Sequence, residues 1–231
     1  MFSKKELIIF DMDGTLIDSA PSLAYALNKT LEQLKLPTYD LPTIRQWIGN
    51  GADILIKRAL TGDYNYENHP IDSEEFLRTK KLFLEIYGAN LTKDATLYDG
   101  VEATLKKLAQ NYTLALATNK PVEFIGKMLQ SFNIEKYFRL SLGAGSVAKK
   151  KPDPEILFTI CKQLDIAPAK AVMVGDSKND LLAAKAANID SIALTYGYNQ
   201  GVNLKEFAPT VICNHFSEIE HYFSSENLVK A

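Results

Sequence analysis

Two acidic residues separated by a single residue follow a short apolar run near the start of the chain. The run, 7–10, is an unbroken series of Leu, Ile and Phe, and Asp11, Asp13 and Gly14 come directly after it. Such a run predicts a buried strand, and ligands of open α/β sheets bind where strands end at the carboxyl edge. Two carboxylates this close repel each other unless a cation or hydrogen-bond donors neutralise them. An Asp-Gly turn would explain Asp13 and Gly14 but not Asp11, so we expect a catalytic or metal-binding role here.

A hydroxyl and an amide follow a second apolar stretch. Thr118 and Asn119 lie between the run 113–117, which predicts a strand, and Pro121, where a helix is expected to begin. A hydroxyl with free backbone N–H groups at a helix N-terminus can bind an anion. The alternative is an ordinary helix cap, which uses the same residue types.

A lysine lies directly before two prolines. Lys151 is followed by Pro152-Asp153-Pro154. The proline rings restrict the backbone, so this one side chain can be aimed in a fixed direction. Lys149 and Lys150, in contrast, are typical of a solvated basic run.

A second acidic pair follows a third predicted strand. Asp176 comes after the apolar run 171–174, and Asp180 lies one helical turn later. A capping role explains Ser177 but not Asp176. The sequence therefore predicts acids at two strand ends, a hydroxyl at another and a lysine nearby, which are the groups that a site for Mg²⁺ and a phosphate requires.

Two regions differ in the elements that they predict. Residues 18–92 have apolar positions at helical spacing and no convincing strand, whereas strands and helices alternate from 93 onward. This pattern predicts an α/β protein in which a Rossmann-like, doubly wound parallel sheet core (1–17 and 93–231) carries an all-helical cap (18–92) inserted after the first strand. A cap inserted there would act as a lid over the site and determine substrate specificity.

Composition and charge limit the partners. The net charge of the 231-residue chain is −2, so we expect no binding to nucleic acid, and no apolar segment is long enough for a membrane span. Cys161 and Cys213 lie far apart in apolar contexts and are expected to be core residues of a cytoplasmic protein. A monomer or a homodimer is compatible with the sequence.

The four groups, in order, resemble the four motifs of phosphatases of the haloacid dehalogenase superfamily. Those motifs are Asp-x-Asp-Gly-Thr (11–15), a Thr at a strand end (Thr118), a Lys (Lys151) and Gly-Asp-x-x-x-Asp (175–180). The helical insertion between the first two resembles the first cap type of that superfamily. The resemblance implies a phosphatase fold with a lid.

The resemblance also assigns roles to the acids. Asp11 would be the nucleophile that becomes an aspartyl phosphate, and Asp13 would be the general acid and base. Mg²⁺ would be held by the carboxylates of Asp11 and Asp176 and by the backbone carbonyl of Asp13. Dehalogenases of the superfamily lack a carboxylate at the position of Asp13, so its presence argues against dehalogenation.

Further residues would hold the phosphoryl group. By the same resemblance, Thr118, the backbone of Asn119 and Lys151 would contact phosphoryl oxygens as charge spreads in the transition state. Asp180 would orient Lys151 or a water molecule on the metal.

Two other stretches resemble bacterial phosphoglycolate phosphatases. They are 47–53 (Trp-Ile-Gly-Asn-Gly-Ala-Asp) and 194–199 (Leu-Thr-Tyr-Gly-Tyr-Asn), although Gly49-Asn50-Gly51 could simply be a turn between cap helices. A substrate with both a phosphate and a carboxylate needs cations or N–H donors from the lid. The candidates in the cap are Arg45, Lys57, Arg58 and the backbone around Gly49, Asn50 and Gly51.

The sequence therefore predicts a Mg²⁺-dependent phosphomonoesterase that converts 2-phosphoglycolate, a small phosphorylated metabolite, to glycolate and phosphate. A sugar-phosphate phosphatase or a phosphotransferase resembling β-phosphoglucomutase is an alternative with the same motifs. A phosphoacceptor regulatory module is more remote, because it needs neither the helical insertion nor a general acid such as Asp13.

Overall fold

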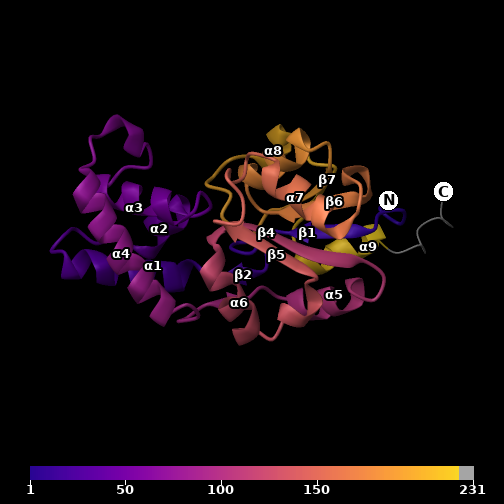
Figure 1. The fold of residues 1–231 in the computed structure, drawn as a ribbon, viewed down its shortest axis with the longest axis horizontal. Coiled ribbons are helices and arrows are strands. Elements are labelled where there is room, and N and C mark those ends of the chain that lie inside the picture. The colour runs from indigo at the N-terminus through magenta and orange to yellow at the C-terminus, as the bar shows by residue number, and fades with distance from the viewer. Residues whose placement is uncertain (224–231) are drawn as a thin grey trace.

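The protein is built on a six-stranded parallel sheet, described by a computed structural model for residues 1–223 (Figure 1). The strand order is β5-β4-β1-β6-β7-β8, and each neighbouring pair is parallel. The predicted α/β class is confirmed. The strands are β1 Leu7–Phe10, β4 Thr113–Pro121, β5 Leu140–Ala144, β6 Ala171–Gly175, β7 Asp190–Leu194 and β8 Val211–Cys213.

Helices cover both faces of this sheet. Strand residues alternate between two apolar clusters, so Ile8 and Phe10 lie in one and Leu7 and Ile9 in the other. The first cluster packs against α5 (Val101–Leu108), α6 (Val122–Ser131) and α9 (Glu220–Phe223), and the second packs against α7 (Glu155–Leu164) and α8 (Lys178–Ala186). Figure 1 shows α7 and α8 above the sheet and α5 and α6 below it.

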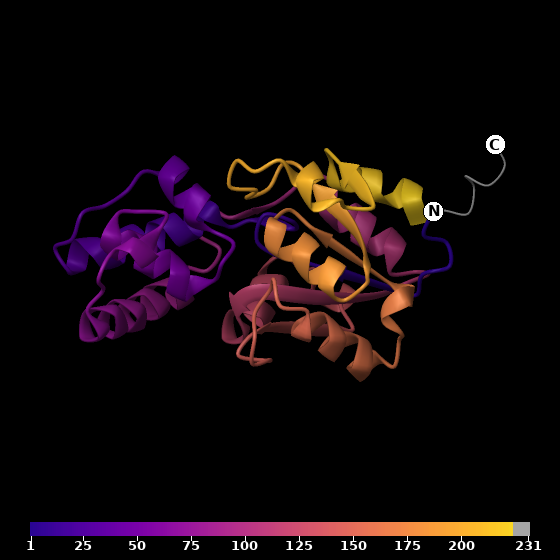
Figure 2. The same ribbon diagram turned by 90° about the horizontal axis from the view of Figure 1, so that it is seen from above.

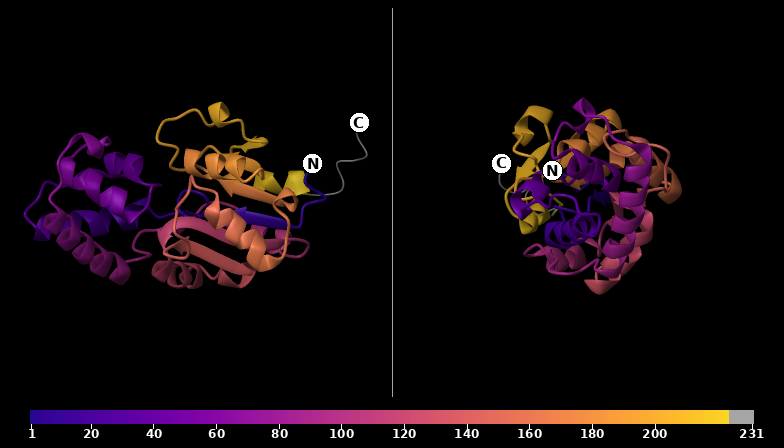
Figure 3. Two further views of the ribbon diagram at one scale, coloured as in Figure 1. Left: turned by 45° about the horizontal axis from the view of Figure 1, so that its top comes forward. Right: turned by 90° about the vertical axis from the view of Figure 1, so that its left-hand side faces the viewer.

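The cap consists of four helices with their own apolar core. They are α1 Ala20–Gln33, α2 Leu41–Trp47, α3 Ala52–Thr61 and α4 Ser73–Ala89. Asp40 and Asp72 cap α2 and α4 by accepting from the N–H groups of Thr43 and Glu75. Figures 2 and 3 show the cap at one end of the molecule, opposite the N-terminus. Because the parallel strands run toward that end, their carboxyl edge faces the cap.

A two-stranded ribbon joins the cap to the core. β2 (Ile17–Asp18) pairs antiparallel with β3 (Thr96–Leu97), where the chain leaves the core and where it returns. Neither strand was predicted, because two residues are too few to show a periodic pattern. The boundaries expected at 17/18 and 92/93 lie beside this ribbon and stay a prediction.

Both cysteines are buried and free, as the sequence predicted. No helix within residues 1–223 is both long enough and apolar enough to cross a membrane.

Candidate active site

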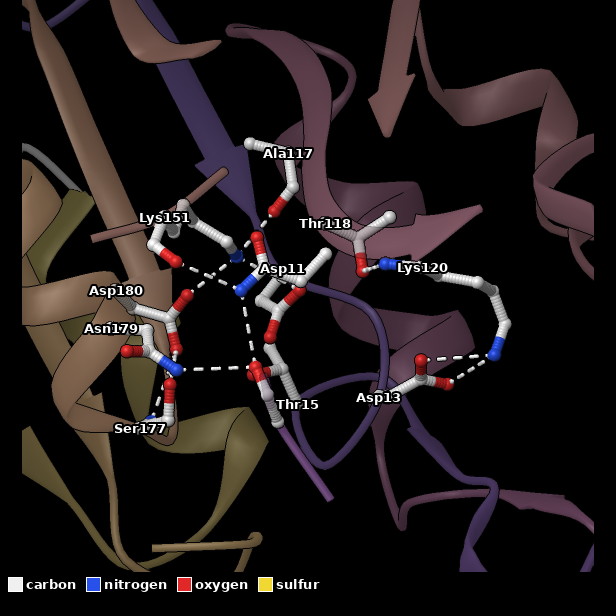
Figure 4. Close-up of polar contacts among 12 residues, drawn as sticks. Asp11, Asp13, Thr15, Ala117, Thr118, Lys120, Lys151, Ser177, Asn179 and Asp180 are labelled. Carbon is white, nitrogen blue, oxygen red and sulfur yellow. Dashed lines mark hydrogen bonds and ion pairs between the residues drawn. The ribbon is translucent and has the colours of Figure 1, made fainter. Parts of the chain in front are cut away.

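The carboxyl edge of the sheet brings the predicted acids together (Figure 4). Asp11 follows β1 and Asp176 follows β6, and these neighbouring strands are in register from Leu7 with Ala171 to Phe10 with Val174. Gly14 makes this approach possible, because its φ is +87° and a Cβ there would lie 2.3 Å from Oδ2 of Asp176. The absence of a side chain at Gly14 in the first motif thus leaves room for the carboxylate of Asp176 in the fourth motif.

Lys151 lies between two of these carboxylates. Its Nζ is 3.0 Å from Oδ1 of Asp11, 2.6 Å from Oδ1 of Asp180 and 2.6 Å from the carbonyl oxygen of Ala117. The lysine is 3% exposed. Burial lowers its pKa, but Asp11 and Asp180 outweigh burial, so its pKa is raised and it remains an ammonium ion. A fixed cation therefore lies directly beside the predicted nucleophile.

Both carboxylate oxygens of Asp180 accept hydrogen bonds from neighbouring residues. Its Oδ2 accepts from the backbone N–H of Ser177 at 3.0 Å and from the Ser177 hydroxyl at 2.7 Å, which is a capping box at the start of α8. Its Oδ1 accepts from Lys151. This contact agrees with a role for Asp180 in orienting Lys151.

Asp11, Asp176 and Asp180 form the cluster that could hold a metal ion. One carboxylate oxygen of each lies within 4.8 Å of the others. Burial and the neighbouring acids raise the pKa of Asp11 to about 7 and raise the pKa of Asp176 well above its usual range. A divalent cation would remove this repulsion and keep both groups ionised, so the donor set fits a hard cation with oxygen ligands. Asp180 also accepts from Lys151 and Ser177, and the assignment of the ion to Asp11 and Asp176 stays a prediction.

Asp176 is oriented by two short hydrogen bonds. Its Oδ1 accepts from the hydroxyl of Thr15 at 2.6 Å, and its Oδ2 accepts from the backbone N–H of Tyr198 at 2.6 Å. The hydroxyl of Tyr198 donates to Asp18 in the ribbon. The stretch 194–199 therefore supports the acid of the fourth motif.

Thr118 and Asn119 lie at the end of β4, beside Asp11. Thr118 is 2% exposed and its hydroxyl accepts from the backbone N–H of Lys120 at 3.3 Å. The side chain of Asn119 donates to the carbonyl oxygens of Gly49 and Lys151 at 3.1 and 3.0 Å. The amide of Asn119 thus joins the cap loop to the lysine loop, and phosphate binding by its backbone stays a prediction.

Asp13 points away from Asp11 toward the cap and meets a lysine that was not singled out in the sequence (Figure 4). Lys120 Nζ lies 3.0 and 2.9 Å from the two carboxylate oxygens of Asp13 and 2.6 Å from the hydroxyl of Tyr87 on α4. The hydroxyl of Ser19 donates to Asp13 at 2.6 Å. Burial lowers the pKa of Lys120, but Asp13 and Tyr87 outweigh it and raise that pKa, so Lys120 is a buried cation.

The loop at Gly49-Asn50-Gly51 lies directly over the site. The carbonyl oxygen of Gly49 accepts from the side-chain amides of both Asn119 and Asn179 at 3.1 Å. Gly49 and Gly51 have φ of +113° and +87°, which favours glycine at both positions. In this arrangement the cap is closed on the core.

The three cap cations lie elsewhere. Arg45 forms a two-point ion pair with Asp18 at 3.0 and 3.1 Å. Arg58 is buried, donates to the carbonyl oxygens of Trp47 and Tyr64, and also donates to Asn50 in the loop. Lys57 lies over aromatic rings of the cap. None of these cations lines the cavity described next.

A cavity of about 40 Å³ lies between cap and core. Its core side is polar and its cap side is mostly apolar. The lining residues are Asp11, Asp13, Thr118, Asn119, Lys120 and Pro121 from the core, and Leu23, Ile48, Gly49, Gly51, Ala52, Leu55, Phe83 and Tyr87 from the cap.

Residues 8–194 match the family described as haloacid dehalogenase-like hydrolase. A phosphoglycolate phosphatase of Colwellia psychrerythraea is 44% identical over 94% of this chain and 96% of its own length. One of Salmonella typhimurium is 40% identical over 92% of this chain and 90% of its own length. A crystal structure described as a predicted phosphoglycolate phosphatase from Haemophilus somnus superposes with a TM-score of 0.89 at 36% identity, over 96% of this chain and 99% of that chain. The chain therefore belongs to the haloacid dehalogenase-like hydrolases and, among them, to the phosphoglycolate phosphatase family.

Proposed function

We propose that the protein hydrolyses 2-phosphoglycolate to glycolate and phosphate in a Mg²⁺-dependent reaction. The observation that carries the proposal is the cavity itself, which places Asp11 and Asp13 opposite the Gly49–Gly51 loop of the cap. Phosphoglycolate phosphatases are similar to this chain over most of its length. Asp11 has a fixed cation beside it, and Asp13 lines the same cavity.

In the first step, a carboxylate oxygen of Asp11 attacks phosphorus. The bond between phosphorus and the glycolate oxygen breaks, and that oxygen takes a proton from Asp13. The ammonium of Lys151 and the hydroxyl of Thr118 stabilise the charge that spreads over the phosphoryl oxygens. The products are glycolate and an aspartyl phosphate.

In the second step, a water molecule attacks the same phosphorus. Asp13 accepts a proton from the water, and the bond between phosphorus and the Asp11 oxygen breaks. Inorganic phosphate leaves, and both aspartates return to their starting state. One carboxylate thus serves as acid and then as base.

Asp11 and Asp176, with the backbone carbonyl of Asp13, would hold the Mg²⁺ ion. The ion supplies positive charge against the phosphoryl oxygens and keeps the buried carboxylates ionised. Asp180 and Thr15 keep the neighbouring groups in place through the hydrogen bonds described above.

The similarity to phosphoglycolate phosphatases, over more than 90% of this chain, favours glycolate over a sugar as the leaving group. This observation counts against the sugar-phosphate alternatives. The helical insertion and Asp13 count against a phosphoacceptor module, because such a module needs neither a lid nor a general acid.

Phosphate release from a panel of esters tests the proposal. The panel contains 2-phosphoglycolate, glucose 6-phosphate, glycerol 3-phosphate and a nucleoside monophosphate, each with Mg²⁺ and with a chelator. We expect metal-dependent release with the highest kcat/KM on 2-phosphoglycolate. Equal rates on all esters would contradict the substrate, and activity that persists with the chelator would contradict the metal dependence.

A further inference from the structure

The carboxylate of 2-phosphoglycolate would need a cation inside the cavity, and the cap does not provide one. Neither Arg45, which contacts Asp18, nor Arg58, which donates to backbone carbonyls within the cap, lines the cavity. Among the described residues that line the cavity, Lys120 is the one with a cationic side chain. A buried carboxylate without a partner is costly, because it loses its water without compensation. Lys120 is therefore the candidate partner.

The surroundings of Lys120 hold its ammonium in one place. The residue is 4% exposed, and its Nζ lies 4.9 Å from the centre of the Tyr87 ring as well as 2.6 Å from its hydroxyl. The ring of Tyr87 stacks on Phe83 at 5.6 Å between centres and meets Phe124 edge-on at 5.3 Å. Nζ donates to the Tyr87 oxygen, and the hydroxyl of Ser22 is a second hydrogen-bond partner of the Tyr87 hydroxyl, so Tyr87 is itself held in place.

We propose that Lys120 of the core and Tyr87 of the cap form the subsite for the carboxylate of the leaving group. The inference rests on the proposed function. Asp13 must reach the leaving oxygen of the substrate, and a single carbon atom separates that oxygen from the carboxylate. Lys120 Nζ, about 3 Å from both oxygens of Asp13, is therefore where that carboxylate would arrive. The ammonium of Lys120 would donate to it in place of one of its two contacts with Asp13, and the hydroxyl of Tyr87 would keep the ammonium in position.

This subsite would use both parts of the molecule. Lys120 belongs to the last residues of β4, where the pairing with β5 becomes irregular between Ala117 and Pro121. Tyr87 lies near the end of α4 in the cap. The carboxylate subsite would thus be complete only when the cap is closed. A neutral leaving group would gain nothing from the ammonium.

The test compares two substrates of similar size. 2-Phosphoglycolate carries the carboxylate, and 2-hydroxyethyl phosphate replaces it with a neutral hydroxymethyl group. The quantity measured is the ratio of kcat/KM for the two esters with Mg²⁺. We expect Lys120→Met to lower this ratio by about 10- to 100-fold, the value of one hydrogen bond to a charged group, mainly through a higher KM for 2-phosphoglycolate. If Lys120 served only to position Asp13, Lys120→Met would lower kcat/KM for both esters equally and leave the ratio unchanged.

Two further variants keep the test decisive. Tyr87→Phe keeps the ring and removes only the hydroxyl, so we expect a loss of a few-fold in the same ratio even if Lys120→Met fails to fold. Lys149→Met is the matched control, because the side chain of this exposed lysine pairs with Asp153 at 3.4 Å and does not line the cavity, so the ratio should not change. Melting curves establish that each variant is folded.

Two results would overturn the inference, and they differ from each other. If the wild type prefers 2-phosphoglycolate and folded Lys120→Met and Tyr87→Phe keep the preference, the subsite is wrong and the substrate stands. If the wild type hydrolyses both esters equally well, the proposed substrate itself is wrong.

Discussion

The two sides of the cavity are built in opposite ways. On the core side, buried charged groups are tied to one another, with Lys151 between Asp11 and Asp180 at 3.0 and 2.6 Å. On the cap side, the lining consists of the Gly49–Gly51 loop, apolar side chains and Tyr87, whose hydroxyl accepts from Lys120, and none of the cap residues that line the cavity is charged. This difference suggests that the core performs the reaction, while the cap excludes water and selects the leaving group.

Asp11→Asn should have the largest effect on turnover. The variant keeps the shape of the side chain but removes the nucleophile, so we expect kcat to fall by about 10⁴-fold or more. Phosphate release, with deamidation excluded by mass spectrometry, measures the effect. Asp99→Asn, at an exposed position, is the control. Multiple turnovers by folded Asp11→Asn would place the nucleophile elsewhere.

Asp13→Asn should impair both chemical steps. We expect kcat to fall by about 10²- to 10⁴-fold, the usual contribution of general acid–base catalysis. Rapid-quench kinetics with 2-phosphoglycolate separates formation of the aspartyl phosphate from its breakdown. A wild-type kcat would mean that another group carries the proton.

Gly51→Ala should test the cap side alone. With φ at +87° and a Cβ 3.0 Å from the carbonyl oxygen of Asn119, an alanine would strain the loop and push the cap away from the core. We expect kcat/KM to fall by about 10-fold, as for a misplaced lid. Gly126→Ala in α6 is the matched control, because nothing lies within 4 Å of its Cβ position. It should leave activity unchanged, and equal effects of the two variants would contradict a specific role for the loop.

The stability of the folded protein should depend on pH, because the buried carboxylates on the core side of the cavity repel one another when they are ionised. Without a divalent ion, the pKa of Asp11 is about 7 in the folded protein against an ordinary value of 3.8, so the folded state keeps a proton that the unfolded chain releases between these values. The free energy of unfolding should therefore fall as the pH rises from 4 to 7, by up to about 1.4 kcal/mol per pH unit from this group.

Urea unfolding at several pH values, with a chelator and with Mg²⁺, measures this effect. Mg²⁺ should reduce the fall, because it stabilises the ionised carboxylates. Asp11→Asn should remove the part of the decrease in the free energy of unfolding that comes from ionisation of Asp11. If the free energy of unfolding rose with pH over this range in the presence of the chelator, the ionised form of Asp11 would not be disfavoured in the folded state, and the account of the pH dependence would be wrong.

The core side could be predicted from the sequence to a large extent, whereas on the cap side the loop Gly49-Asn50-Gly51 could be singled out but its contacts could not. Asp11 and Asp176 each follow a continuous apolar run, so both the strand and the placement of the acid are local signals. Lys120, in contrast, meets Asp13 across 107 residues and Tyr87 across 33, and no local pattern marks either contact.

The cap cations illustrate the same limit. Arg45 was one of several candidates for binding the substrate, and it pairs with Asp18 in the connecting ribbon, whose strands are too short to be predicted. The carbonyl of Gly49 is held by Asn119 and Asn179, which lie 70 and 130 residues away. Contacts between cap and core depend on how the two parts close, and the spacing of residues along the chain does not determine this.

The central claim is that the reaction passes through a phosphate on Asp11, and trapping that species tests it most directly. The Asp13→Asn variant, in which breakdown should be slow, is mixed with 2-phosphoglycolate and Mg²⁺, quenched in acid and digested for peptide mass spectrometry. The account predicts one phosphate on the peptide that carries Asp11, formed within the first turnover and absent with a chelator. A phosphate on any other residue, or glycolate release with no phosphorylated peptide, would contradict it.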